Sequence, residues 1–201
     1  MNGSFKQYRI LNEEIIHDGF FKVKRLGLKH SLYEGGWSPE IQRELFQRGD
    51  CVAVLPYDPV TDQVVLVEQF RVGALLDKPC PWLLEIVAGA VEPGESPADV
   101  ALRESLEEAG CDVTKLIKIS EFYTSPGASS ERITLYCGRI DSRNVGGVGG
   151  VTFEHEDIFA SVADFDQAME KVKNGEIDSA ISIVALQWLA LNREWVREIW
   201  S

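Results

Sequence analysis

The most informative segment of the chain runs from residue 89 to residue 111 and reads GAVEPGESPADVALRESLEEAGC. It begins with a loop rich in glycine and proline and continues with a helical pattern. Ser96 is a good helix N-cap, Pro97 suits the first helical position, and Gly110 is a typical C-terminal stop. The segment therefore predicts a tight loop followed directly by a helix.

The predicted helix carries clustered carboxylates, Glu104, Glu107 and Glu108. Like charges three or four residues apart on a helix each cost roughly 0.2–0.5 kcal/mol unless something neutralises them. A helical projection leaves these glutamates on one arc with Arg103 and Val100, and we expect the opposite arc to pack against a sheet: Ala98, Ala101, Leu102, Ser105, Leu106 and Ala109. The acidic arc is either a solvated face or a site for a divalent cation, and oxygen ligands suit Mg²⁺.

The rest of the chain mixes strand and helix patterns. We expect strands at residues 51–55, 63–71, 116–123 and 132–140, with a short one in WLLEIVAGAVE, and helices at residues 164–174 and 178–200. This order predicts an α/β fold in which helices cover both faces of a sheet. The run RNVGGVGGVTFEHED reads as a mobile loop, because glycine restricts the backbone so little.

Residues 1–48 form a separate pattern of short apolar alternations around the turn EGGWSP. They predict an antiparallel strand pair, which is a natural dimerisation element. We therefore divide the chain into an N-terminal β region at residues 1–48 and a main domain at residues 49–201.

Composition excludes several classes of protein. The formal charge of −12 disfavours a nucleic-acid polymer or an anionic membrane surface as partner. The four cysteines and three histidines are dispersed, which is not a zinc pattern. The N-terminus has no signal-peptide pattern, and SAISIVALQWLALN is shorter than the ~20 apolar residues of a membrane span. We expect a soluble, cytoplasmic protein with reduced thiols.

The spacing of residues 89–111 resembles the Nudix box, in which the fixed positions correspond here to Gly89, Glu95, Arg103, Glu104, Glu107, Glu108 and Gly110. Ser105 and Cys111 depart from the usual larger aliphatic residues. Further stretches, including LVEQFR, PWLLEIVAG, SPGASSER and EHEDI, resemble the ADP-ribose pyrophosphatase branch of Nudix hydrolases. This resemblance implies an α/β/α sandwich with a mixed sheet and a homodimer.

The resemblance also implies a cation site. Glu104 and Glu108 would bind Mg²⁺, with Mn²⁺ as the alternative, together with the carbonyl of Ala88 and with assistance from Glu107. Glu95 would pair with Arg103 and orient the loop against the helix. Metal ions at such a site polarise phosphoryl oxygens and acidify the attacking water.

The general base is expected on the loop FEHED, where Glu154 matches best and Glu156 is the alternative. The glycine run before it would then act as a hinge, although a tolerated flexible insertion explains it as well. Arg43, Arg71 and Glu131 match residues near the phosphates and ribose. Phe20 could stack on adenine or belong to a core, and Phe20 and Arg43 could serve a partner's site.

The implied activity is Mg²⁺-dependent hydrolysis of ADP-ribose, a small nucleoside diphosphate, to AMP and ribose 5-phosphate. Another nucleoside diphosphate sugar is the neighbouring alternative, because the box specifies the reaction and says little about the sugar. A nucleotide sensor without catalysis is the alternative from another class.

Overall fold

A computed structural model describes residues 6–76, 79–151 and 155–200. The chain forms two compact units. The smaller unit comprises Met1–Gly49 and Tyr123–Arg132, and the larger unit comprises Asp50–Phe122 and Ile133–Ser201. Within the part of the chain described, no helix is long and apolar enough to cross a membrane.

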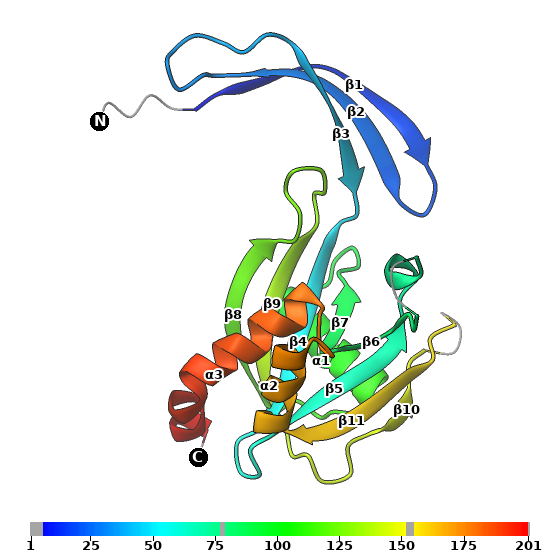
Figure 1. The fold of residues 1–201 in the computed structure, drawn as a ribbon, viewed down its shortest axis with the longest axis vertical. Helices are drawn as coiled ribbons and strands as arrows, with labels where there is room; N and C mark the ends of the chain where they lie inside the picture. Colours follow the sequence, from blue (N-terminus) through cyan, green and yellow to red (C-terminus); the bar gives the residue numbers. More distant parts are fainter. Residues whose placement is uncertain (1–5, 77–78, 152–154, 201) are drawn as a thin grey trace. The chain divides into compact units, whose positions relative to one another are not determined.

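The smaller unit contains an antiparallel sheet with the order β1-β2-β3 (Figure 1). Its strands are β1 (Tyr8–Asp18), β2 (Lys22–His30) and β3 (Ile41–Gln47). The pair β2 and β3 confirms the predicted strand pair. The sequence did not predict β1, whose residues are all exposed, because an exposed edge strand need not alternate between apolar and polar side chains.

The larger unit is built on a mixed sheet with the order β10-β11-β5-β4-β9-β8. These strands are β4 (Asp50–Asp58), β5 (Gln63–Phe70), β8 (Lys115–Tyr123), β9 (Arg132–Arg139), β10 (Gly147–Gly149) and β11 (Ile158–Asp164). Two short strands extend the sheet, since β6 (Trp82–Glu85) pairs with β5 and β7 (Val87–Ala90) pairs with β4. A short 3₁₀ helix, η1 (Val72–Ala74), follows β5.

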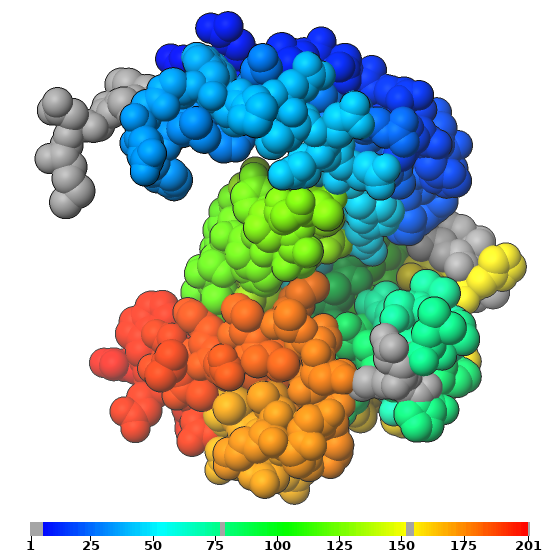
Figure 2. All heavy atoms as spheres, turned by 45° about the horizontal axis from the view of Figure 1, so that its top comes forward, coloured from blue at the N-terminus to red at the C-terminus, as the bar shows by residue number. Residues whose placement is uncertain are grey.

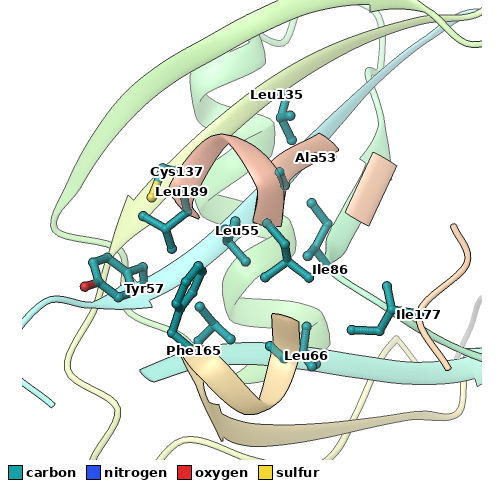
Figure 3. Close-up of a cluster of buried hydrophobic side chains, with 14 of the residues drawn as sticks. Ala53, Leu55, Tyr57, Leu66, Ile86, Leu135, Cys137, Phe165, Ile177 and Leu189 are labelled. Carbon is teal, nitrogen blue, oxygen red and sulfur yellow. The ribbon is translucent and has the colours of Figure 1, made fainter. Parts of the chain in front are cut away.

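Helices α2 (Phe165–Asn174) and α3 (Ala180–Trp200) cover one face of this sheet. Successive strand residues point to opposite faces, so Leu55, Tyr57 and Leu66 share the face under these helices. There they pack against Phe165 and Leu189 (Figure 3). Figure 2 shows the two helices next to each other, from orange to red, on the surface of the larger unit.

Helix α1 (Pro97–Ala109) covers the opposite face. The intervening residues of β4 and β5, Val54 and Val65, pack there against Val100 and Ala101 of the helix. The predicted α/β class, with helices on both faces of a mixed sheet, is therefore confirmed.

The structure differs from the sequence-based expectations at three places. Residues 147–149, expected in a mobile loop, form β10, and β11 was not predicted at all. The stretch WLLEIVAGAVE forms two strands with different partners, where one strand was expected. β11, β6 and β7 depend on pairing with β5 or β4, and β10 depends on pairing with β11. Local sequence patterns do not specify these partners.

Candidate active site

The ends of α1 have the caps that the sequence predicts. The hydroxyl oxygen of Ser96 accepts a hydrogen bond from the backbone N–H of Asp99 at 3.2 Å and donates one to its carboxylate at 2.6 Å. Gly110 ends the helix in the left-handed conformation, with φ 64°, and donates to the carbonyl of Leu106. These local contacts define where the acidic helix begins and ends.

The orientation of α1 differs from the expected one. Val100, Ala101, Ser105, Glu108 and Ala109 are buried. Leu102 and Leu106, expected to pack against the sheet, are 42% and 62% exposed. The buried face of α1 thus includes Glu108, whereas Leu102 and Leu106 lie on the exposed face.

This orientation of α1 follows from close contacts with glycine residues on both sides of the helix. A Cβ atom added to Gly89 in β7 would lie 1.8 Å from Oε1 of Glu104. A Cβ added to Gly149 in β10 would lie 2.4 Å from the carbonyl oxygen of Glu108. The N–H of Gly150 also donates to the carbonyl of Glu107 at 2.9 Å. Only glycine allows β7 and β10 to approach α1 this closely.

Arg103 links the loop before α1 to the carboxylates on the helix. Its Nε and Nη2 atoms donate to the two carboxylate oxygens of Glu95 at 3.0 and 3.1 Å, which confirms the predicted pair. Its Nη1 atom donates to Glu104 and Glu107, at 2.9 Å each. The hydrogen bond from Arg103 lowers the pKa of the Glu95 carboxyl. One guanidinium therefore partly offsets the repulsion among three carboxylates.

Glu108 is the most deeply buried of the clustered carboxylates, with 2% of the residue exposed. Burial raises its pKa to about 8, and Glu104 adds to this rise. The N–H of Ala88 opposes the rise by donating to Oε2 of Glu108 at 3.1 Å. Burial likewise raises the pKa of Glu104.

The sheet side of the site contributes two more charged residues. Arg71, which directly follows β5, donates from Nε to Glu85 at 2.6 Å, and its positive charge lowers the pKa of Glu108. Glu156, which precedes β11, raises the pKa of both Glu104 and Glu108, so its carboxylate lies within electrostatic range of them. Its Oε2 atom accepts a hydrogen bond from the N–H of Val151 at 3.2 Å.

The structure thus gathers six of the predicted site residues in the larger unit: Arg71, Ala88, Glu104, Glu107, Glu108 and Glu156. Sequence reasoning missed Glu85 as the partner of Arg71. The available signal was one acidic residue inside the apolar run WLLEIVAG. Glu154 lies outside the described residues, and its predicted role stays a prediction.

The other predicted residues belong to the smaller unit. Phe20 is 95% exposed, so the alternative that it belongs to a core is wrong. Arg43 is exposed, and its guanidinium donates to the carbonyl of Gln42 at 2.7 Å. Glu131 accepts a hydrogen bond from Thr124 at 2.8 Å and pairs with Arg48.

The donor set fits a hard divalent cation. Among the described residues, no three acidic, imidazole or thiol side chains are gathered as a preformed metal site. However, Glu104 and Glu108 present carboxylate oxygens at a buried position where an isolated negative charge is unfavourable, and a cation would offset that cost. The absence of a Cβ at Gly89 leaves room for the Glu104 carboxylate.

The chain is similar to several known proteins. A family model described as the NUDIX domain matches residues 47–197. An ADP-ribose pyrophosphatase of Escherichia coli K12 is 42% identical over 192 residues, covering 96% of this chain and 92% of the relative. One of Haemophilus influenzae is 44% identical over 201 residues, covering 98% and 93%.

Two further matches are more distant. A GDP-mannose pyrophosphatase of Cronobacter sakazakii is 34% identical over 186 residues, covering 90% of this chain and 96% of the relative. A crystal structure described as an ADP compounds hydrolase is 20% identical, with a TM-score of 0.69 over 96% of this chain and 95% of that one. This last similarity concerns the fold alone.

Proposed function

The chain belongs to the NUDIX domain family, and on this basis we propose that it hydrolyses the pyrophosphate bond of ADP-ribose to AMP and ribose 5-phosphate, with Mg²⁺ as cofactor. Two relatives with the name ADP-ribose pyrophosphatase, 42% and 44% identical over nearly the whole chain, support this substrate. The free cysteines Cys111 and Cys137, both buried, agree with a reducing compartment such as the cytoplasm.

The observation that carries the proposal is the position of Glu104 and Glu108. The helix holds both carboxylates against Ala88 and Gly89 of β7, where burial raises their pKa. A structural salt bridge would need a cationic side chain at Glu108, yet the hydrogen bonds of Arg103 go to Glu95, Glu104 and Glu107. A bound divalent cation is the natural partner for a carboxylate in that position.

In this proposal the carboxylates of Glu104 and Glu108 and the carbonyl of Ala88 hold the cation, and Glu107 assists. Mn²⁺ is the alternative ion. When bound, the cation neutralises the diphosphate and acidifies the attacking water. Arg103 stays anchored to Glu95 and keeps the loop before α1 in place.

The proposed base is a glutamate of the sequence FEHED at residues 153–157, Glu154 first and Glu156 second. It takes a proton from water as the oxygen of that water bonds to phosphorus, and the bridging P–O bond breaks with its electron pair on the leaving phosphate. Glu154→Gln is expected to depress kcat with little change in the Mg²⁺ dependence. If only Glu156→Gln has this effect, the base is Glu156.

The ends of the substrate are assigned to Arg43, Arg71, Glu131 and Phe20. An exposed aromatic ring such as Phe20 is suited to stacking on a base, worth ~1–3 kcal/mol in nucleic-acid binders. The proposal includes a homodimer formed through residues 1–48.

The proposal is tested by incubating the purified protein with ADP-ribose, with and without Mg²⁺, and identifying the products. A panel of ADP-ribose, GDP-mannose, ADP-glucose, UDP-glucose and NADH then ranks substrates by kcat/KM. The 34% identical GDP-mannose pyrophosphatase makes GDP-mannose the main competitor. A higher kcat/KM for any competitor refutes the assignment of ADP-ribose.

A nucleotide sensor without catalysis is the alternative from another class, and turnover of ADP-ribose by the parent protein separates the two. Glu108→Gln then tests the proposed metal ligand. This substitution keeps the size and hydrogen-bonding ability of a side chain whose pKa is already raised, so the fold is retained. We expect most of the turnover to be lost. Hydrolysis at the parent rate would overturn the assignment of Glu108 as a metal ligand.

A further inference from the structure

Gln69 is a buried polar residue that the proposed mechanism does not use. The residue is 8% exposed, and its Nε2 atom has no hydrogen-bond partner in the described part of the chain. Buried amide groups in native proteins are nearly always paired, and an unpaired one is costly. An unpaired amide group on a strand that is paired on both sides therefore calls for a functional explanation.

The strand places Gln69 on the face of the sheet that α1 covers. Val65 and Val67 of the same strand pack on this face, and Gln69 and Arg71 follow them with the two-residue period of a strand. Gln69 lies between its cross-strand partners Leu83 in β6 and Ile158 in β11. It is thus next to Arg71, whose charge acts on Glu108.

The same register brings Glu156 close to Gln69. Ile158 pairs with Gln69, and Glu156 is two residues before it, so the register of β11 continued to Glu156 would make the two diagonal neighbours on one face. On its other side Glu156 continues the hairpin of β10 and β11, since its N–H donates to the carbonyl of Val151 at 3.4 Å. Long side chains at diagonal positions are within reach of one another.

The chemistry of the two side chains is complementary. Val151 donates to Oε2 of Glu156, which leaves Oε1 as a candidate acceptor. A carboxylate can only accept hydrogen bonds, so the amide nitrogen of Gln69, and not its amide oxygen, is the group that suits it. No acceptor among the described residues takes the Nε2 hydrogens in this structure.

We propose that Gln69 is a positioning residue whose amide N–H donates to Oε1 of Glu156 and holds that carboxylate beside Glu104 and Glu108 when the site is loaded. The inference rests on the proposed function, because it assigns Gln69 a part in the same site. Gln69 itself does not contact the reacting atoms. It acts by restricting the orientation of a carboxylate that is anchored at only one oxygen.

Kinetics of single variants test the proposal first. Gln69→Met keeps the length of the side chain and removes the donor, and we expect kcat to fall roughly 10–100-fold with KM changed little, as for other groups that orient ligands. The melting temperature should not fall, because the substitution removes an unpaired buried group. Gln63→Met is the matched control on the same strand and should keep kcat. An unchanged kcat in Gln69→Met overturns the proposal.

A double-mutant cycle tests whether Gln69 acts through Glu156. Glu156→Ala should lower kcat, and adding Gln69→Met to it should cause no further loss. If the two losses multiply, or if Glu156→Ala has no effect, Gln69 does not act through Glu156 and the proposal fails.

A spectroscopic measurement gives an answer that does not depend on turnover. The side-chain amide signals of Gln69, identified by their absence in Gln69→Met, are followed by NMR as Mg²⁺ and AMP are added. One amide proton should shift downfield in the parent protein and not in Glu156→Ala. No shift in the parent, or the same shift in Glu156→Ala, overturns the proposal. A protein that shows the shift but does not hydrolyse ADP-ribose refutes only the proposed function.

Discussion

Glu108 illustrates how one residue combines structural and chemical roles. Its carboxyl is buried, its pKa is raised to about 8 by that burial, and one of its oxygens accepts from the N–H of Ala88. A proton or a metal ion can offset the cost of burial, and the two compete for the same oxygens. The behaviour of this residue should therefore depend on pH and on Mg²⁺ together.

Stability without Mg²⁺ should decrease as pH rises. A carboxyl group whose pKa is higher in the folded state than in the unfolded state binds more protons when folded. Its contribution is complete below the unfolded pKa, about 4.3, and is lost as pH rises through about 8. In Glu108→Gln the side chain is neutral at every pH, so the free energy of unfolding should lack this part of the decrease. Urea unfolding at about pH 6 and about pH 9 measures the difference. An equal decrease in both proteins would contradict the raised pKa.

The apparent affinity for Mg²⁺ should change with pH in the opposite direction. The folded protein must release the proton of Glu108 before that carboxylate binds a cation, so affinity should rise as pH increases through about 8. Calorimetry in two buffers of different ionisation enthalpy detects the released proton. Binding without proton release near neutral pH would exclude Glu108 from the ligand set.

Gly89 provides a second test at the residue scale. An alanine there would place a methyl group 1.8 Å from Oε1 and 2.5 Å from Cγ of Glu104, so this carboxylate must move. Because Glu104 is a proposed metal ligand, we expect Gly89→Ala to lower kcat by roughly tenfold or more. Gly73→Ala is the matched control, because a Cβ there meets no atom within 4 Å. Equal activity of the two variants would show that hydrolysis does not depend on the observed position of the Glu104 carboxylate.

At the scale of the element, the contact between β10 and α1 determines which face of the helix is buried. The backbone of Gly149 lies against the carbonyls of Glu107 and Glu108, and Gly150 donates to Glu107. The glycine run is thus explained in part by close packing and not only by freedom to move. Without this contact, we would expect α1 to rotate about its axis until Leu102 and Leu106, which are exposed, pack against the sheet.

Gly149→Ala should therefore disturb the packing of β10 against α1. The new Cβ would lie 2.4 Å from a backbone oxygen, which cannot swing away as a side chain can. We expect a loss of about 1–3 kcal/mol in the free energy of unfolding, as for other overpacked positions, together with reduced kcat/KM. Val148→Ala, at an exposed neighbour in the same strand, is the control and should leave both nearly unchanged. A stable, fully active Gly149→Ala protein would show that β10 does not need this close contact.

At the scale of the whole molecule, the sheet of the smaller unit has many exposed apolar side chains. In β1 these are Tyr8, Ile10, Leu11, Ile15 and Ile16. Such a surface is typical of an interface between proteins. It supports the proposed homodimer through residues 1–48.

The dimer is tested by light scattering after gel filtration. The parent should have about twice the chain mass of 22.4 kDa. Ile15→Lys should shift the mass towards that of a monomer, because it places a charge in an apolar surface. Val60→Lys, at an exposed position in a turn of the larger unit, is the control and should stay dimeric. A monomeric parent would refute the proposed dimer.

What the sequence alone determined is local. The caps at Ser96 and Gly110 and the pairing of Glu95 with Arg103 depend on residues close in the chain, and the structure has all three. The spacing of residues 89–111 also pointed to the family, because the positions of that pattern lie close together in the sequence.

Only the tertiary structure decided which face of α1 is buried, that the glycine run forms β10, and that Glu85 and Gln69 share a face with Arg71. Each of these depends on how strands pair with one another or pack against α1 in the folded chain. A shift of one residue in any of those pairings would move every side chain of the strand to the other face, and no local pattern records which register is adopted.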